Sequence, residues 1–144
     1  MQELVDNVHQ WINEIQLLAV AILVGFLQLC WAAIAARQQQ GLAWARGARD
    51  EHKPITGVAA RLERAFRNYM ETFPLFAAAV IAAMTVEKTG MLTWWGSLLY
   101  VGARILYVPL YAAGVPSIRT LVWFISIVGL LMVVVALFIP NGAS

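Results

Sequence analysis

The chain has 144 residues, of which 61% are hydrophobic and only 12% are charged, and its mean hydropathy is +0.71. A soluble domain does not sustain so apolar a composition. This excludes a soluble enzyme, and with no basic, aromatic-interleaved module present we expect no nucleic-acid partner. The formal charge of +2 conceals an asymmetry, because seven of the ten Lys and Arg residues lie between Arg37 and Arg67.

The first hydrophobic run covers residues 15–36 and is interrupted only by Gln16 and Gln28. About 20 apolar residues are enough to cross the hydrocarbon core of a bilayer, so this run predicts a membrane-spanning helix. The acidic segment before it lacks the positive n-region of a secretory signal peptide, and we expect the helix to be retained. The polar, glycine-containing segment 37–56 then predicts an exposed loop.

The second predicted helix, residues 57–86, is apolar without interruption only over 72–86, which spans roughly 22 Å at the helical rise. That is shorter than the hydrocarbon core, which is about 30 Å thick. The helix must therefore extend backward through Glu71 and Asn68, which brings polar residues into the edge of the membrane. We expect Pro74 to be tolerated inside it, because membrane helices accommodate proline.

The third and fourth predicted helices are residues 91–114 and 117–139. Trp94 lies near the start of the third helix, where an interfacial aromatic belt is expected. The Gly-Val-Pro sequence at 114–116 separates the two helices, and proline is favoured at a helix start. The predicted fold is all-α, a four-helix transmembrane bundle that forms one domain over residues 1–144.

Orientation follows from the basic residues, because cytoplasmic loops of membrane proteins are enriched in Lys and Arg. We expect a multi-pass integral membrane protein with the 37–56 loop in the cytoplasm and both termini outside. The turn between the third and fourth helices returns to the cytoplasmic side. Arg119 is therefore expected near the basic loop.

Two polar stripes are predicted on neighbouring helices, because their members recur at spacings of three and four residues. The first contains Arg61, Arg64, Asn68 and Glu71, and the second contains Arg104, Tyr107 and Tyr111. Glu71 and Arg104 are each about 20 Å from the same membrane surface. We predict a Glu71–Arg104 ion pair, because an unpaired arginine at this depth would be costly.

An ion pair would engage only two of the polar groups in this region, and the remainder is net cationic and rich in donors. The set is Arg64, Asn68, Glu71, Arg104, Tyr107, Tyr111 and Arg119. This composition predicts a site for an anionic ligand with carboxylates, aided by the amide groups at the start of the fourth helix. His9 and His52 lack metal-ligand spacing, so no metal site is predicted.

Two sequence segments resemble a known family. RAFRNYMETFPLF at 64–76 resembles the second-helix signature of the membrane-associated proteins in eicosanoid and glutathione metabolism, the MAPEG family. ARILYVPLY at 103–111 resembles the third-helix pattern of the leukotriene and microsomal prostaglandin synthases. Arg119 follows it as the catalytic arginine of that family does. Ala60, Phe66 and Thr72 depart from the family pattern.

The resemblance implies a homotrimer that binds glutathione between neighbouring subunits at the cytoplasmic side, in a bacterial inner membrane given the short chain. It implies a glutathione-dependent transferase or peroxidase whose hydrophobic or lipid substrate enters from the bilayer. Arg119 would stabilise the glutathione thiolate, because a guanidinium lowers the pKa of a nearby thiol, and Arg104 would support Glu71. The implied glutathione-binding residues are Arg37, Arg64, Asn68, Glu71, Tyr107 and Tyr111.

Two other classes of function remain open at this point. A non-catalytic lipid-binding or adaptor protein of the same fold would keep the trimer and a cleft but would not activate a thiolate. The presence of Arg119 and both tyrosines favours the enzyme. A small channel or transporter could also use intramembrane Arg and Glu residues, but the chain lacks the repeats and paired broken helices that mark many transporters.

Overall fold

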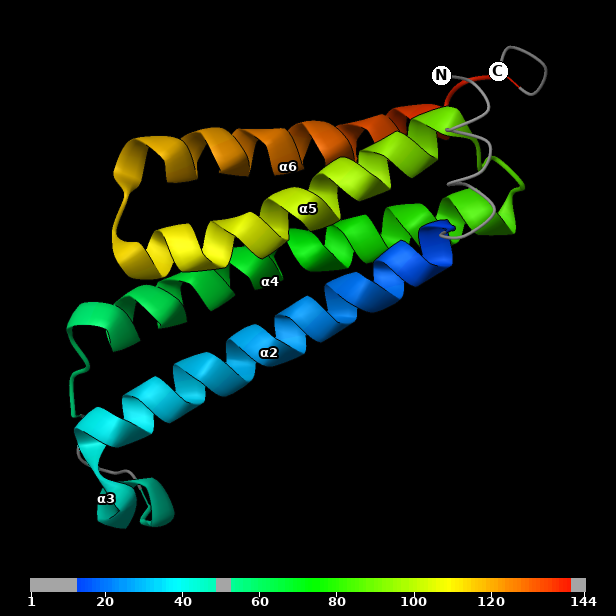
Figure 1. Cartoon of the computed structure of the whole chain (residues 1–144). Helices are drawn as coiled ribbons and strands as arrows, with labels where there is room; N and C mark the ends of the chain where they lie inside the picture. The colour runs from blue at the N-terminus through cyan, green and yellow to red at the C-terminus, as the bar shows by residue number, and fades with distance from the viewer. Residues whose placement is uncertain (1–12, 49–52, 141–144) are drawn as a thin grey trace.

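The computed structural model describes residues 13–48 and 53–140, and within these ranges all the regular secondary structure is helical. Four long helices lie side by side, and one short helix, α3, follows the first of them (Figure 1). This all-helical structure was predicted, whereas α3 was not; His9 and His52 lie outside the described residues. The helices are α2 (Glu14–Gln40), α3 (Leu42–Arg46), α4 (Gly57–Thr85), α5 (Met91–Ala113) and α6 (Pro116–Ala136).

Helix α2 begins and ends with clear capping signals. The side chain of Asn13 accepts a hydrogen bond from the Gln16 amide, and the Gln16 side chain accepts one from the Asn13 amide, which together form a capping box. The helix continues to Gln40, four residues beyond the predicted end. It stops at Gly41, whose φ of 88° lies in the region that glycine favours.

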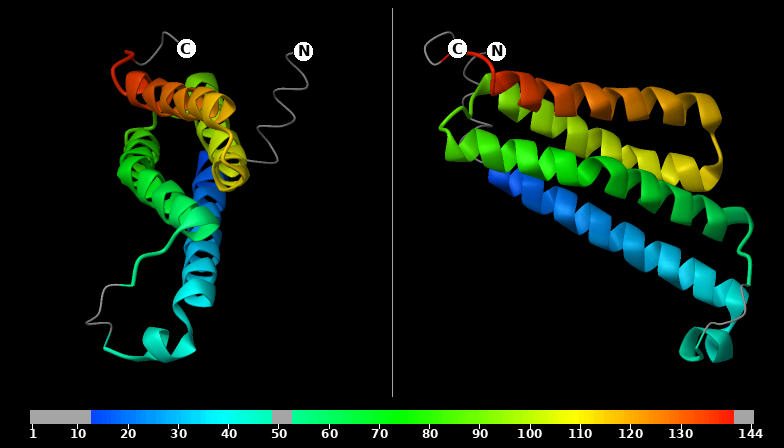
Figure 2. Two further views of the ribbon diagram at one scale, coloured as in Figure 1. Left: turned by 90° about the vertical axis from the view of Figure 1, so that its left-hand side faces the viewer. Right: turned by 180° about the vertical axis from the view of Figure 1, so that it is seen from behind.

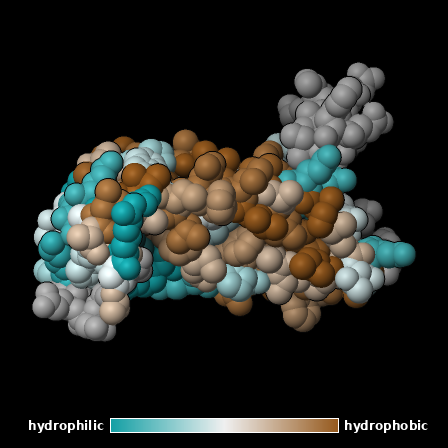
Figure 3. All heavy atoms as spheres, turned by 90° about the horizontal axis from the view of Figure 1, so that it is seen from below, coloured by the Kyte–Doolittle hydropathy of each residue, from teal (hydrophilic) through white to brown (hydrophobic). Residues whose placement is uncertain are grey.

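Three helices, α2, α5 and α6, are long and apolar enough to cross a membrane, as expected of an integral membrane protein. Helix α4 differs from them, because charged residues occupy its first half, although its 29 residues would span about 43 Å. Figure 3 shows hydrophobic residues along most of one face of the molecule, many hydrophilic residues at the end that holds α3 and fewer at the opposite end. The polar groups are therefore concentrated at one end of the molecule.

Helices α5 and α6 pack most closely through two glycines. A Cβ atom added at Gly96 would lie 2.7 Å from the carbonyl oxygen of Gly129, and one added at Gly129 would lie 2.6 Å from that of Gly96. Only glycine fits such an approach, and small residues allow membrane helices to pack this closely. From this crossing the two helices diverge toward the 114–116 turn (Figures 1 and 2).

The turn between α5 and α6 forms where the sequence predicted a break. Gly114 adopts φ 76°, and the Val115 amide donates to the Leu110 carbonyl at 3.2 Å, which closes the end of α5. Pro116 is the first residue of α6, as predicted. Arg119 consequently lies at the end of the first turn of α6.

The molecule has two ends, which we name by the segments they contain. The loop end contains the end of α2, the start of α4 and the 114–116 turn, and the terminal end contains the start of α2, the 86–90 turn and the end of α6. At the terminal end, Thr93 Oγ1 donates to Glu14 Oε1 at 2.7 Å. Lys88 Nζ donates to the carbonyl oxygens of Leu137 and Ile139 at 2.6 and 3.0 Å. Polar bonds therefore tie the long helices together at this end.

Candidate functional site

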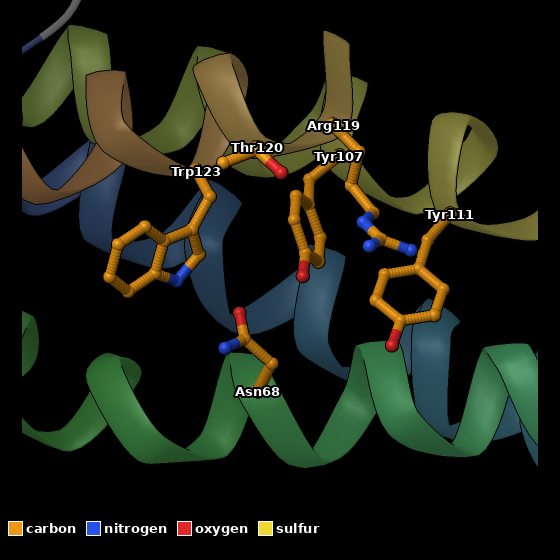
Figure 4. A pocket seen from close by; sticks show the side chains of 6 residues that line it. All are labelled: Asn68, Tyr107, Tyr111, Arg119, Thr120 and Trp123. Atoms are coloured by element: carbon orange, nitrogen blue, oxygen red, sulfur yellow. The ribbon is translucent and has the colours of Figure 1, made fainter. Parts of the chain in front are cut away.

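A polar cavity lies toward the loop end, where α5 and α6 diverge. Its volume is about 180 Å³, and its lining comes from three helices, so residues far apart in the sequence meet there. Figure 4 shows these side chains converging on one space between the helices. The lining residues are Asn68 from α4, Tyr107 and Tyr111 from α5, and Arg119, Thr120 and Trp123 from α6.

Two tyrosines and Arg119 form one wall of the cavity. Tyr107 and Tyr111, one turn apart on α5, pack edge to face with ring centroids 5.4 Å apart. The Arg119 Cζ atom lies 4.4 Å from the centroid of the Tyr111 ring, which is a cation–π contact. No carboxylate among the described residues lies within 4.0 Å of the Arg119 guanidinium. Its positive charge is therefore available to an anion.

Asn68 forms the opposite wall, and a buried arginine holds it. Arg104 is only 1% exposed; its Nη1 donates to Asn68 Oδ1 at 2.8 Å, and its Nη2 donates to Thr72 Oγ1 at 2.6 Å. The Nδ2 group of Asn68 in turn donates to Glu71 Oε2 at 3.3 Å. A hydrogen-bonded chain thus runs from the interior of α5 to the surface of α4.

The predicted ion pair between Glu71 and Arg104 is wrong for this chain. Within the described ranges, the ion pair at 4.0 Å or less joins Arg67 to Glu63, at 3.3 Å. Equal depth in the membrane gives the positions of two residues along their helix axes, but it does not give the direction in which each side chain points around its helix. Arg104 faces the side of α4 that carries Asn68, whereas Glu71 is exposed. Glu71 and Arg104 are linked only through the Asn68 amide.

The structure brings together four of the predicted site residues and leaves three outside the cavity. Arg64 and Glu71 are exposed on α4, about one turn on either side of Asn68. Arg37 is exposed in the last turn of α2. The four that line the cavity are Asn68, Tyr107, Tyr111 and Arg119.

Two lining residues, Thr120 and Trp123, were not predicted. Trp123 follows Arg119 by four residues, so the helical spacing alone places both on one face of α6 and could have identified it. Its Nε1 atom is buried and has no hydrogen-bond partner in the part of the chain that the structure describes. Figure 4 shows the indole nitrogen on the side of the ring that faces Asn68. The cavity therefore has an unused N–H donor.

The chemistry of the cavity follows from its lining, which contains a guanidinium, an indole N–H, an amide and three hydroxyl groups, but no carboxylate. Donors and a cation that the protein holds in fixed positions can bind an anion and stabilise negative charge that develops during a reaction. The described lining is therefore suited to a carboxylate or a thiolate.

Comparison with known families gives a match over most of the chain. The model of the MAPEG family matches residues 17–139, which include every residue that lines the cavity and nearly all of the four long helices. No curated protein matches the chain. The MAPEG family includes glutathione transferases and eicosanoid synthases. Because the match covers most of the sequence, and because the helical fold agrees with it, this chain belongs to the MAPEG family.

Proposed function

We propose that this protein is a membrane-embedded, glutathione-dependent transferase or peroxidase that acts on a hydrophobic electrophile. The observation that carries the proposal is the cavity in which Arg119 has no carboxylate partner and in which the Trp123 indole N–H and the two tyrosine hydroxyl groups can donate hydrogen bonds. Glutathione supplies the complementary groups, namely two carboxylates and a thiol that reacts as its anion.

Arg119 is proposed to stabilise the glutathione thiolate. Its guanidinium is held over Tyr111, and the backbone amides of the first turn of α6 add positive potential beside it. Both features lower the pKa of a bound thiol and increase the fraction present as thiolate. In the transfer reaction the thiol proton goes to solvent, and the thiolate sulfur forms a bond to the electrophilic carbon of the substrate. The bond from that carbon to the leaving group breaks, and the leaving group departs with the bonding electrons, as chloride does from 1-chloro-2,4-dinitrobenzene.

The cavity of one chain is smaller than a typical ligand pocket, which measures about 300–1,000 Å³. We therefore propose that it is part of a site completed in a homotrimer, with glutathione bound between neighbouring subunits. Arg64 and Glu71 lie on the exposed side of α4 beside the cavity, where they can contact a ligand or a neighbour. Arg37 is exposed on a different helix and would reach the glutathione of an adjacent subunit.

An apolar groove supports a hydrophobic substrate. It has a volume of about 430 Å³ and lies between α4 and α6, where residues 75–82 and 130–137 line it with aliphatic side chains. Leu75 and Leu130 each lie seven residues beyond a polar-cavity residue, Asn68 and Trp123, or about 10 Å along the helix. A lipid-soluble substrate could therefore bind in the groove with its reactive end toward the thiolate.

We propose that α4 crosses the membrane together with α2, α5 and α6, which makes a four-helix transmembrane bundle. The proposed orientation has the 37–56 loop in the cytoplasm and both termini outside, in a bacterial inner membrane. The clustering of basic residues at the loop end supports this orientation, because positive charge is retained on the cytoplasmic side.

The test compares the wild-type protein with Arg119→Ala in detergent micelles. Wild type should bind glutathione, show the ultraviolet absorbance of a thiolate and conjugate glutathione to 1-chloro-2,4-dinitrobenzene. Arg119→Ala should lower kcat/KM about a hundredfold, as removal of one group that stabilises developing negative charge typically does. Arg46→Ala, which removes an exposed arginine of α3, should retain activity. Absence of glutathione binding by wild type, or equal activity of Arg119→Ala, would contradict the proposal.

The apolar groove also supports a second candidate, a non-catalytic lipid-binding protein. Such a protein would bind a fluorescent fatty acid without binding glutathione. Measurement of both ligands on the same preparation therefore separates the two functions.

A further inference from the structure

Thr72 lies at a buried contact between α4 and α5, and it has no role in the reaction proposed above. Its side chain is 8% exposed, and its Oγ1 atom lies 2.6 Å from Arg104 Nη2 and 3.1 Å from the Tyr100 hydroxyl. It also lies 3.4 Å from the carbonyl oxygen of Tyr69 in its own helix. A single hydroxyl group therefore has a cation, a phenol and a backbone carbonyl around it.

The Thr72 hydroxyl accepts one of two hydrogen bonds that the Arg104 guanidinium donates to α4. Asn68 and Thr72 are four residues apart and share one face of α4, and each accepts a hydrogen bond from a different Nη atom of Arg104. The rings of Tyr100 and Tyr107 lie 5.5 and 5.4 Å from the Arg104 Cζ atom. The orientation of the guanidinium thus depends on the acceptor that Thr72 provides.

The position of the Arg104 guanidinium in turn decides whether the oxygen or the nitrogen of the Asn68 amide faces it. An asparagine amide can be turned over so that its oxygen and nitrogen exchange places. Arginine has only donors, so the atom of Asn68 that faces Arg104 must be the acceptor oxygen. The NH2 group must then face the other way, where it donates to Glu71. Figure 4 shows the amide oxygen pointing toward Trp123 and Tyr107, with the NH2 group turned to the side.

We propose that Thr72 is a positioning residue that acts through Arg104 to keep the Asn68 amide in the orientation in which its oxygen faces Arg104 and its NH2 group faces Glu71. The proposal rests on glutathione as the ligand of the cavity, and it predicts that glutathione binding depends on this orientation of the Asn68 amide. Without the Thr72 hydroxyl, the Arg104 guanidinium loses one of its two hydrogen bonds to α4, and the Asn68 amide can turn over.

The experiment compares three variants in glutathione binding and turnover. Thr72→Val removes the hydroxyl at nearly constant volume and should weaken glutathione binding about tenfold, the order expected when a hydrogen bond to a charged group is lost. Thr72→Ser keeps the hydroxyl and should bind as wild type does. Thr85→Val is the matched control on the same helix, because the Thr85 hydroxyl bonds only to the Ile81 carbonyl, far from the cavity. The KM for glutathione should rise in Thr72→Val, whereas kcat should stay within about twofold, because the proposed thiolate contact of Arg119 is intact.

A second readout needs no glutathione. Protein labelled with ¹⁵N-asparagine gives side-chain NH2 signals from four asparagines, and Asn68→Ala identifies the pair that belongs to Asn68. Thr72→Val should move and broaden this pair, and Thr72→Ser should restore it. If Thr72→Val does not fold, Thr72→Ala removes the hydroxyl without placing a new methyl group against Arg104.

The two readouts separate failure of this inference from failure of the proposed function. If wild type does not bind glutathione but the Asn68 signals follow the Thr72 hydroxyl, the positioning role stands and the proposed function fails. If the Asn68 signals are the same in wild type and Thr72→Val, the positioning role is overturned. Weak binding by Thr72→Ser would also overturn it, because the hydroxyl would then not be the cause.

Discussion

The two ends of the molecule use polar groups in different ways. At the terminal end, Glu14 accepts from Thr93, and Lys88 donates to two carbonyl groups at the end of α6. Toward the loop end, Arg104 and Arg119 have no carboxylate within 4.0 Å in the described part of the chain. Polar bonds also join helices at the loop end, where Arg61 Nε donates to the Ala112 carbonyl at 2.9 Å. The difference is that the Arg119 guanidinium, which lines the cavity, has no anionic partner among the described residues.

The difference is already visible in the distribution of charge along the sequence. Segments 37–71 and 104–119 together contain nine of the ten Lys and Arg residues but four of the eight Asp and Glu residues, a surplus of five positive charges. The rest of the chain has one lysine and four acids. A surplus of this size is not neutralised within the loop-end segments, so it attracts anions, whether solvent counterions, lipid head groups or an anionic ligand. We therefore expect substitutions at the terminal end to change stability and those at the loop end to change binding.

The largest effect on stability is expected from Gly129→Ala, at the close contact between α5 and α6. The new Cβ would lie 2.6 Å from both the Gly96 oxygen and the Tyr100 nitrogen, so the backbones of α5 and α6 must separate. Overpacking of this kind costs about 1–3 kcal/mol of unfolding free energy. Thermal unfolding in detergent, followed by circular dichroism, should show a lower Tm than wild type.

Gly102→Ala provides the control for this substitution. Gly102 also lies in α5, but a Cβ atom added there meets nothing within 4 Å. Its Tm should be equal to or above that of wild type, because alanine favours a helix more than glycine does. Equal loss of stability in the two variants would show that the Gly96–Gly129 approach is not the cause.

The second prediction concerns the exposed side of α4 near the loop end. Glu71→Gln removes the negative charge beside Asn68 while keeping an acceptor for its amide. If Glu71 contacts the amino group of glutathione, affinity should fall about tenfold, which corresponds to about 1.4 kcal/mol. Isothermal titration calorimetry measures the change. The Tm should stay near that of wild type, because Glu71 is exposed and makes no ion pair within the described chain.

The sequence was sufficient for the helices and for part of the site. Hydrophobic runs and the Gly114 to Pro116 break predict the helices because the membrane requires long apolar segments and because glycine and proline mark their ends. The cavity residues Asn68 and Arg119 could be identified because their helices were known and an anion site needs such groups.

What could not be predicted was the direction in which side chains point around their helices. Arg104 contacts Asn68 and Thr72 rather than Glu71, because the rotation of α4 against α5 decides which side chains of α4 face the arginine. That rotation depends on packing along the whole interface, and no single spacing in the sequence encodes it. Trp123 is a different case, because its spacing of four residues from Arg119 places both on one face of α6, although an aromatic residue in an apolar helix is usually a core or lipid-facing residue.

The third prediction tests the terminal end. Lys88→Met keeps most of the side-chain length but removes the ammonium group that donates to Leu137 and Ile139. The carbonyl groups at the end of α6 lose these partners, so unfolding free energy should fall by roughly 1 kcal/mol. Glutathione affinity should not change, because Lys88 lies at the opposite end from the cavity. A loss of affinity without a loss of stability would contradict the division between the two ends.

The smallest effect is expected from salt. The loop end has a positive surplus and glutathione is a net anion at neutral pH, so part of the attraction between them is long-range. Salt screens this attraction, because the Debye length falls from about 30 Å at 0.01 M to about 8 Å at 0.15 M. The Kd for glutathione should rise a few-fold over this interval, whereas the KM for an uncharged electrophile should not, since aliphatic side chains line its proposed groove. Arg119→Lys keeps the charge and should show the same dependence on salt as wild type, even if its overall affinity is lower. If glutathione binding were independent of salt, the buried contacts of the cavity alone would account for recognition, and the surplus of charge at the loop end would serve orientation in the membrane and not binding.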